Sequence, residues 1–381
     1  MKVKLAVLVA AMVTAMSCGV DDAPEVREVG KEQVTAVLND AVQLGYPGAE
    51  AVIDDRGHRW RVTAGVGDLA TGEPFAANAR VRIGSNTKTF VATVMLQLVA
   101  EGKVELDAPV ERYLPGVVHG PGIDGNRITI RNLLQHTSGL PEYAAEFGAT
   151  PKPWQLEILS EQARWQTADM AAVLRTALTG PAAFEPGAKW AYSNTNFAIV
   201  GMVIERITGA SVGAEITRRI LEPLGLHDTY YPAPDETDMR GPHPIGYTEV
   251  GGRRTDYTSQ NVSAAGAAGA MVASGVDLNR FFTALLGGKL LPPAQLAEMQ
   301  NVRAISESGT MAYGLGLMRL SMPCGQFFWG HSGGISGSIT YAGVVPATGR
   351  AVTISLNQDF TDEARSPAAS RALTAAVCPS P

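Results

Sequence analysis

Strand-like segments occur near both ends of this sequence, whereas the residues between them are patterned almost entirely as helices. Residues 49–53 and 60–66 predict two strands joined by the turn Asp54–Gly57. The later strand patterns cover residues 313–320, 326–329, 335–345 and 351–356. A sheet built from all of these segments must pair strands from opposite ends of the chain.

Apolar residues at helical spacing fill most of the remainder. These helical segments are 31–44, 90–99, 130–136, 168–178, 197–207, 212–221, 278–286 and 368–377. We therefore expect an α+β fold, in which an antiparallel sheet is flanked by N- and C-terminal helices. A mostly helical subdomain, about residues 107–290, is inserted between the two groups of strands, and a cleft is expected where the parts meet.

The first 18 residues are patterned as an export signal. Lys2 and Lys4 precede an uncharged, mostly apolar run at 5–16, which has the length of a signal-peptide core and is too short to span a bilayer. The following Ala15–Cys18 segment resembles the lipobox of bacterial lipoproteins, with ordinary signal cleavage nearby as the alternative. We expect an extracytoplasmic protein, either lipid-anchored to the membrane through Cys18 or secreted, with a linker at 19–30 and one domain at 31–378.

Composition narrows the range of partners. The formal net charge is −6 and no run of Lys or Arg is present, which argues against a nucleic-acid partner because phosphate binding needs a clustered basic face. His58, His119, His227 and His243 lack the spacing of metal ligands, so we expect neither a metal nor another cofactor. The two cysteines after Cys18, at 324 and 378, are expected to form a disulfide in an oxidising compartment.

A candidate nucleophile precedes the 90–99 helix. Ser85 and Lys88 are three residues apart, so a helix that begins here places the amine beside the hydroxyl. A buried Lys with a lowered pKa can take the proton that makes a serine hydroxyl nucleophilic. Taken alone, the pair is equally consistent with a helix N-cap and a surface lysine.

Two further motifs favour the catalytic interpretation of Ser85 and Lys88. Tyr192 and Asn194 belong to the sequence's one Tyr-x-Asn motif, and His331 begins its one His-x-Gly motif. In isolation Tyr192 is also consistent with a core aromatic residue and Asn194 with a helix cap. The combination of three motifs in this order predicts an active site made of Ser85, Lys88, Tyr192, Asn194 and His331.

The sequence resembles the serine DD-peptidase and class C β-lactamase family, most closely its soluble D-alanyl-D-alanine carboxypeptidase branch. The resemblance runs from about residue 34 to 378 and is carried by five blocks, at 82–88, 133–140, 186–197, 313–317 and 330–333. It implies an acyl-enzyme on Ser85, with Lys88 and Tyr192 sharing the proton transfers and Asn194 bonding the substrate amide or the Lys88 amine. It also implies the pairing of Cys324 with Cys378.

The last motif and the residues after it are expected to bind substrate. The resemblance implies that the backbone N–H groups of Ser85 and Gly334 form the oxyanion hole. Ser332 would face the substrate, and the glycines at 333 and 334 would allow its backbone to approach the strand closely. His136, by contrast, is expected to order a loop and to take no part in the chemistry.

The sequence departs from the carboxypeptidase pattern at the carboxylate anchor. Where that branch has an arginine just after the 313–317 block, this chain has Met318, and Arg319 is expected to point away because neighbouring strand residues face opposite sides. A pocket aromatic also corresponds to Ala264 here. These departures place the carboxylate anchor in doubt.

Several functions remain open at this point. The first is a monomeric serine hydrolase, D-alanyl-D-alanine carboxypeptidase-like, acting on small-molecule or peptide substrates such as peptidoglycan stem peptides. The others are an esterase, amidase or β-lactamase that uses the same residues, and a non-catalytic receptor acylated by β-lactams.

Overall fold

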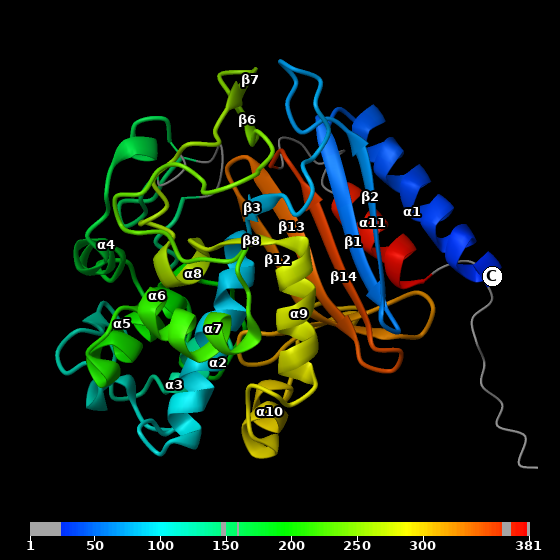
Figure 1. Cartoon of the computed structure of the whole chain (residues 1–381). Helices are drawn as coiled ribbons and strands as arrows, with labels where there is room; N and C mark the ends of the chain where they lie inside the picture. Colours follow the sequence, from blue (N-terminus) through cyan, green and yellow to red (C-terminus); the bar gives the residue numbers. More distant parts are fainter. Residues whose placement is uncertain (1–23, 146–149, 158–159, 360–366, 379–381) are drawn as a thin grey trace, which may run out of the picture.

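An eight-stranded antiparallel sheet organises the molecule, with the strand order β2-β1-β14-β13-β12-β11-β10-β9 (Figure 1). The computed structural model describes residues 24–145, 150–157, 160–359 and 367–378. The expected signal peptide and Cys18 lie outside these residues. Near the β2 edge of the sheet, Ala49 of β1 pairs with Leu356 of β14, so strands from the two ends of the chain are neighbours, as the sequence predicts. The α+β fold class is confirmed.

The bounds of the elements are as follows. The strands of the main sheet are β1 Gly48–Asp55, β2 His58–Gly65, β9 Arg303–Ala304, β10 Met311–Tyr313, β11 Met318–Ser321, β12 Phe327–Ile335, β13 Ser338–Val345 and β14 Arg350–Leu356. The longer helices are α1 Pro24–Gln43, α2 Thr87–Ala100, α4 Met170–Ala177, α5 Asn194–Thr208, α9 Gly275–Leu286, α10 Pro293–Met299 and α11 Ala368–Val377. Shorter helices include α3 Ile130–Leu134, α6 Val212–Ile216, α7 Glu222–Leu224 and α8 Gly266–Gly269.

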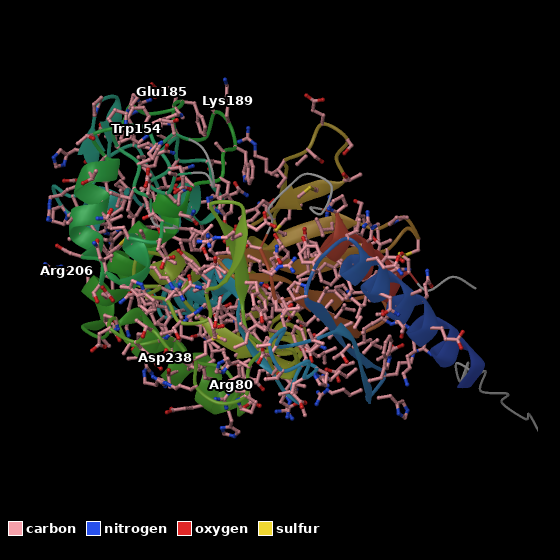
Figure 2. The ribbon with its side chains drawn as sticks, turned by 90° about the horizontal axis from the view of Figure 1, so that it is seen from above. Arg80, Trp154, Glu185, Lys189, Arg206 and Asp238 are labelled. Atoms are coloured by element: carbon pink, nitrogen blue, oxygen red, sulfur yellow. A yellow bond between two sulfur atoms is a disulfide. The ribbon has the colours of Figure 1, made fainter. Side chains whose placement is uncertain are left out.

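Helices cover both faces of the sheet. The terminal helices α1 and α11 pack against each other and cover one face, while α9 packs against β13 and β14 on the other (Figure 1). Apolar residues of α1 such as Val34 and Leu38 are fully buried in a core shared with β1, β14 and α11. A second core is formed around α2 and α5, which lie in the half of the molecule away from α1. The labelled Trp154, Glu185 and Lys189 also lie in that half, seen from above (Figure 2).

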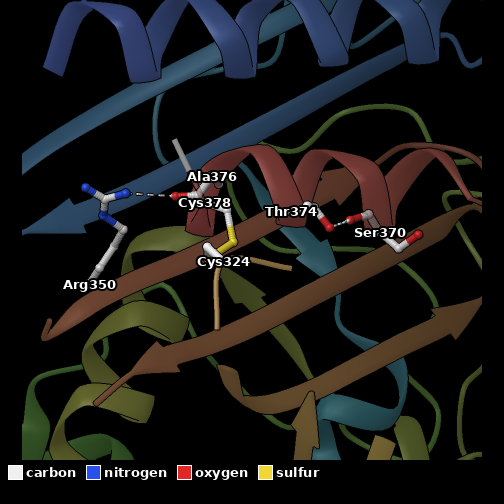
Figure 3. The surroundings of a disulfide bond; sticks show 6 residues. All are labelled: Cys324, Arg350, Ser370, Thr374, Ala376 and Cys378. Atoms are coloured by element: carbon white, nitrogen blue, oxygen red, sulfur yellow. Dashed lines mark hydrogen bonds between the residues drawn. A yellow bond between two sulfur atoms is a disulfide. The ribbon is translucent and has the colours of Figure 1, made fainter. Parts of the chain in front are cut away.

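The end of α11 is tied to the sheet. The sulfur atoms of Cys324, in the β11–β12 turn, and Cys378 are joined, with Cα atoms 5.6 Å apart, a separation at which disulfides form (Figure 3). Arg350 of β14 donates from Nη1 to the carbonyl of Ala376 over 3.2 Å and also binds Asp55 of β1. The structure therefore brings together the two cysteines that the sequence predicts to pair.

Several predicted bounds are wrong. Helix α1 begins at Pro24, so residues 24–30, expected as linker, are helical. The expected strand 313–320 is two strands, β10 and β11, which form an antiparallel pair across the turn at 314–317. The segments expected at 326–329 and 335–345 instead form β12 and β13, which turn at Ser336 and Gly337. The motif that begins at His331 therefore lies within a long strand.

Strands also occur inside the middle region, which the sequence predicts to be helical. They are β8 Val272–Ser274, which pairs with β3 Arg80–Arg82 from outside this region, β4 His119–Gly120 paired with β5 Ile123–Asp124, and β6 Tyr247–Val250 paired with β7 Arg253–Asp256. Helix α9 begins earlier than expected, because Ser274 caps it by accepting a hydrogen bond from the backbone N–H of Asp277.

In the described part of the chain, no single helix is long and apolar enough to cross a membrane. Residues Asn194–Thr208 and Val212–Leu224 together reach that length and composition, but they are bent by 76°. Much of the first of these segments is buried in the core.

Candidate active site

Ser85 lies where the backbone of the helical half touches strand β12. It belongs to a short 3-10 turn, η1 Gly84–Asn86, which leads directly into α2. Gly84 has a φ of +48°, and a Cβ at this position would lie 2.8 Å from the backbone nitrogen of Gly334. Gly333 is equally restricted, because a Cβ there would collide with the carbonyl oxygen of Ile83. The two backbones meet without an intervening side chain.

Lys88 is fully buried beneath the nucleophile. Its Nζ lies 3.0 Å from Ser85 Oγ, 2.7 Å from Asn194 Oδ1 and 2.8 Å from the carbonyl oxygen of Ala268. Burial lowers the pKa of Lys88 to about 7, and the negative charge of Glu142 opposes this shift. A neutral amine that donates to the two carbonyl oxygens would direct its lone pair at the proton of Ser85. The arrangement thus suits a general base.

Tyr192 contacts the nucleophile from the other side. Its hydroxyl donates to Ser85 Oγ over 2.7 Å, and its ring lies beneath Lys88 Nζ at 4.7 Å from the centroid. The residue is 36% exposed, towards the cleft. Burial of the hydroxyl raises the pKa of Tyr192 above its usual range, so the phenol keeps its proton at neutral pH. Tyr192 can therefore act as a proton donor.

Glu142 completes the polar site and was not predicted. Its Oε2 accepts from the backbone N–H of Asn194 at 2.6 Å and from Asn194 Nδ2 at 3.1 Å, and its Oε1 accepts from the N–H of Ala144. Burial raises the pKa of this carboxyl. Because Glu142 binds both the backbone N–H and the side-chain amide nitrogen of Asn194, it fixes the position of the Oδ1 atom that accepts from Lys88. Its one sequence signal is its position directly after the block at 133–140.

His331 is placed differently from Ser85, Lys88, Tyr192 and Asn194. Its Nδ1 lies 2.5 Å from the carbonyl oxygen of Ser332, which requires a proton on Nδ1, and its Nε2 lies 2.9 Å from the hydroxyl of Tyr313. The hydroxyl therefore donates to an unprotonated Nε2. Burial lowers the pKa of His331 to about 3. His331 is thus a neutral imidazole bonded to these two groups.

His136 supports the ring of Tyr192. The two ring centroids are 4.4 Å apart, and His136 Nδ1 accepts from the backbone N–H of Ser193 at 3.3 Å and from Asn196 Nδ2 at 3.0 Å. Burial keeps the pKa of His136 well below its usual value. These contacts are those of a residue that orders its surroundings, which is the role expected from the sequence.

The position expected to anchor a carboxylate holds no cation. Met318 and Ser332 share one face of β11 and β12, with Ser332 Oγ 3.7 Å from Met318 Sδ. Arg319 lies on the opposite face, where its guanidinium stacks on Phe327 at 4.7 Å and lies 5.9 Å from the centroid of Trp329. The expected alternation of residues 318 and 319 is confirmed.

A cleft of about 770 Å³ opens above Ser85. Its wall includes Tyr192, Asn194, Gly334 and the predicted Ala264. In the regions that the structure describes, the charged side chains of this wall are Glu142 and Lys152. Across the same regions, no group of three or more His, Cys, Asp or Glu side chains is placed to hold a metal ion.

Comparison with solved structures shows two similar enzymes. A D-stereospecific amidohydrolase from Streptomyces sp. has a TM-score of 0.83 and 38% identity, covering 92% of this chain and 99% of that one. A D-amino acid amidase from Ochrobactrum anthropi SV3, solved with L-phenylalanine amide, has a TM-score of 0.77 and 28% identity, covering 91% and 98%.

Among curated proteins, an esterase, EstB, from Burkholderia gladioli is 34% identical over 206 residues, which are 53% of this chain and 51% of the esterase. Penicillin-binding protein 4* from Bacillus subtilis (strain 168) is 27% identical over 72% of this chain and 60% of its own length. The chain thus matches little more than half the length of these relatives. The family model described as Beta-lactamase matches residues 27–376, and the chain therefore belongs to the beta-lactamase family of serine hydrolases.

Proposed function

We propose that this protein is a serine amidase that forms an acyl-enzyme on Ser85 and hydrolyses D-amino-acid derivatives with an uncharged leaving group. The observation that carries the proposal is the pair Met318 and Ser332, which provides no cation at the position where the sequence pattern predicts a carboxylate anchor. A buried carboxylate without a cationic partner costs several kcal/mol, whereas an amide or ester leaving group needs no such partner.

The proposed reaction begins with proton transfer from Ser85 Oγ to Lys88 Nζ as Oγ bonds to the substrate carbonyl carbon. The backbone N–H groups of Ser85 and Gly334 are proposed to stabilise the oxyanion, since η1 and β12 are in contact at this point. Tyr192, whose hydroxyl still carries its proton, donates to the leaving nitrogen as the C–N bond breaks, and the Lys88 ammonium then returns a proton to Tyr192, so that both groups regain their starting state. Water then hydrolyses the Ser85 ester and releases the acid.

The acyl side of the substrate is proposed to carry a free amino group. Glu142 lines the cleft near Ser85, and a protonated amine would complement its charge. The names of the amidohydrolase and the amidase support the class of substrate and its D configuration.

The carboxypeptidase function expected from the sequence is the second candidate, and Lys152 is the feature that favours it. Its Nζ lies 5.6 Å from the centroid of Trp154, and both side chains line the cleft. A peptide long enough to reach Lys152 would find a cation there for its carboxylate.

A hydrolysis panel tests these candidates. The substrates are D-phenylalanine amide, its L enantiomer, N-acetyl-D-phenylalanine amide, an N-acylated D-Ala-D-Ala peptide, a chromogenic cephalosporin and a short-chain ester. We expect the highest kcat/KM for D-phenylalanine amide. N-acetylation of this substrate should lower kcat/KM, and the decrease should largely disappear in Glu142→Gln. Fast cleavage of the peptide that is lost in Lys152→Met would establish the carboxypeptidase instead, and stable acylation by the cephalosporin without turnover of any substrate would indicate a receptor.

A further inference from the structure

A second cavity lies behind the catalytic cleft. It has a volume of about 560 Å³ and is lined by residues of α4, α5, α6, the segment 231–234 and the segment 262–270. Most of its wall is apolar, with Met170, Met202 and Val262 among the lining residues. Val262 also lines the catalytic cleft, so the two cavities share the segment that contains α8 as a wall. We call this second space the back cavity. Its volume is in the range of small-molecule sites.

Two polar groups of the back cavity are available to a ligand. The hydroxyl of Tyr231 lies next to Gly266, at the start of α8, and makes no hydrogen bond within the described part of the chain. Glu205 of α5 is exposed, accepts from the backbone N–H of Val212 at 3.3 Å, and has no ion-pair partner among the described residues. The two groups are near each other, because Glu205 binds Val212 and a Cβ on the next residue, Gly213, would lie 3.1 Å from the side chain of Tyr231.

The cation in the wall is already paired. Arg240 donates from Nε and Nη2 to the two carboxylate oxygens of Glu236, each over 2.5 Å, and stacks on Tyr230 at 4.6 Å. The unpaired charge that faces the back cavity is therefore negative. Glu205 lines the back cavity and is exposed, so this side of the back cavity is open to solvent, and Figure 2 shows the next residue, Arg206, at the outer surface of the helical half.

Two elements of the wall also hold the catalytic lysine. Helix α8 supplies the carbonyl of Ala268, and the first residue of α5 supplies Asn194 Oδ1; both atoms accept from Lys88 Nζ. The two helices are in close contact, because a Cβ on Gly201 of α5 would lie only 2.8 Å from the Cβ of Ala267. A molecule in the back cavity would contact α5 and α8 on the side away from Lys88.

We propose that the back cavity binds a small apolar molecule with one ammonium group, and that this binding increases turnover at Ser85. The apolar part packs against Met170, Met202 and Val262, and the ammonium group binds Glu205 beside the Tyr231 hydroxyl. The filled cavity restrains α8 and α5, which keeps both acceptors of Lys88 in place.

Binding is tested by calorimetry at pH 7 with tryptamine and its uncharged analogue tryptophol. We expect tryptamine to bind about three- to tenfold more tightly than tryptophol, a difference that disappears in Glu205→Gln. Ala214→Trp, which places an indole on an exposed wall position of α6, should weaken binding at least tenfold. The control Ala77→Trp adds the same side chain at an exposed position outside the wall and should leave binding unchanged.

The variant Glu142→Gln distinguishes tryptamine binding in the back cavity from binding in the catalytic cleft. Binding that is lost in Glu142→Gln and retained in Ala214→Trp would place tryptamine beside Ser85 and would overturn the proposal. The back-cavity site does not depend on the amidase proposal, because turnover is followed with p-nitrophenyl butyrate, an ester that has no amino group. Saturating tryptamine should raise its kcat about fivefold, an increase that Ala214→Trp abolishes and Ala77→Trp retains. Competitive inhibition or an unchanged kcat would overturn the link to turnover.

Discussion

The Nζ of Lys88 lies 3.0 Å from the Oγ of Ser85, and Asn194 Oδ1 and the carbonyl oxygen of Ala268 hold the amine in this position. Because the two residues act as one unit, their effects on rate should not add. We expect Ser85→Ala to lower kcat on the order of 10⁴-fold or more and Lys88→Ala to be nearly as severe, with the double variant little worse than either. Steady-state kinetics checks this. Losses that multiply in the double variant would show that Lys88 acts elsewhere.

The pH dependence of turnover should report the state of Lys88. The base form of the amine exists above its pKa of about 7 and is lost below it, so kcat/KM for p-nitrophenyl butyrate should fall as the pH drops through about 7. The charge of Glu142 raises that pKa, and Glu142→Gln should therefore move the acid limb to lower pH. Lys152→Met is the control and should leave the midpoint in place. A midpoint that stays the same in Glu142→Gln would argue against Lys88 as the titrating base.

An arginine at position 318 should change specificity. Met318→Arg introduces a guanidinium beside Ser332, and a charge-assisted hydrogen bond to a carboxylate contributes roughly 1.5 to 3 kcal/mol. We expect kcat/KM for a D-Ala-D-Ala peptide, relative to a neutral ester, to rise about ten- to a hundredfold. Met318→Leu is the matched control without charge. An unchanged ratio, together with a large loss of peptide activity in Arg319→Ala, would show that Arg319 already binds the carboxylate.

The pairing of Cys324 with Cys378 should be detectable and stabilising. Peptide mapping by mass spectrometry without reductant should find the two residues linked. The bond closes a loop with a sequence separation of 54, and the double variant Cys324→Ser/Cys378→Ser should lower the free energy of unfolding by roughly 4 kcal/mol, an upper value from chain entropy. Reductant should destabilise the wild type by a similar amount and leave the double variant unaffected. Two free thiols in the wild type would contradict the pairing.

Sequence reasoning located most of the site because its motifs are local. Ser85 and Lys88 share one helical turn, and Tyr192 and Asn194 lie two residues apart, so short patterns identify them. Glu142 was missed because its effect on Lys88 arises from burial and from its bonds to Asn194, which depend on packing between distant segments. The hydrogen bond between His331 and Tyr313 likewise depends on the packing of β12 and β10, which are separated by β11 in the sheet.

Errors in the fold came from short or polar elements. Strand β7 is largely exposed and carries charged residues such as Arg253 and Arg254, so it lacks an apolar alternation that would reveal it, and its partner β6 is only four residues long. Helix α10 is only seven residues long. The break between β10 and β11 comes from the Gly314–Leu317 turn, whose apolar residues continue the pattern of the flanking strands and so predict one strand.

The pairing of β1 with β14 has a consequence for how the protein is made. Ala49 and Leu356 are direct partners, and β13 reaches the rest of the sheet through β14 on one side and β12 on the other. The ribosome synthesises β1 and β2 long before β14. These two strands can therefore form only a hairpin, without the neighbouring strand β14, until nearly the whole chain has been synthesised. Such non-local pairing slows folding. The order of synthesis thus delays completion of the sheet until the last strands have left the ribosome.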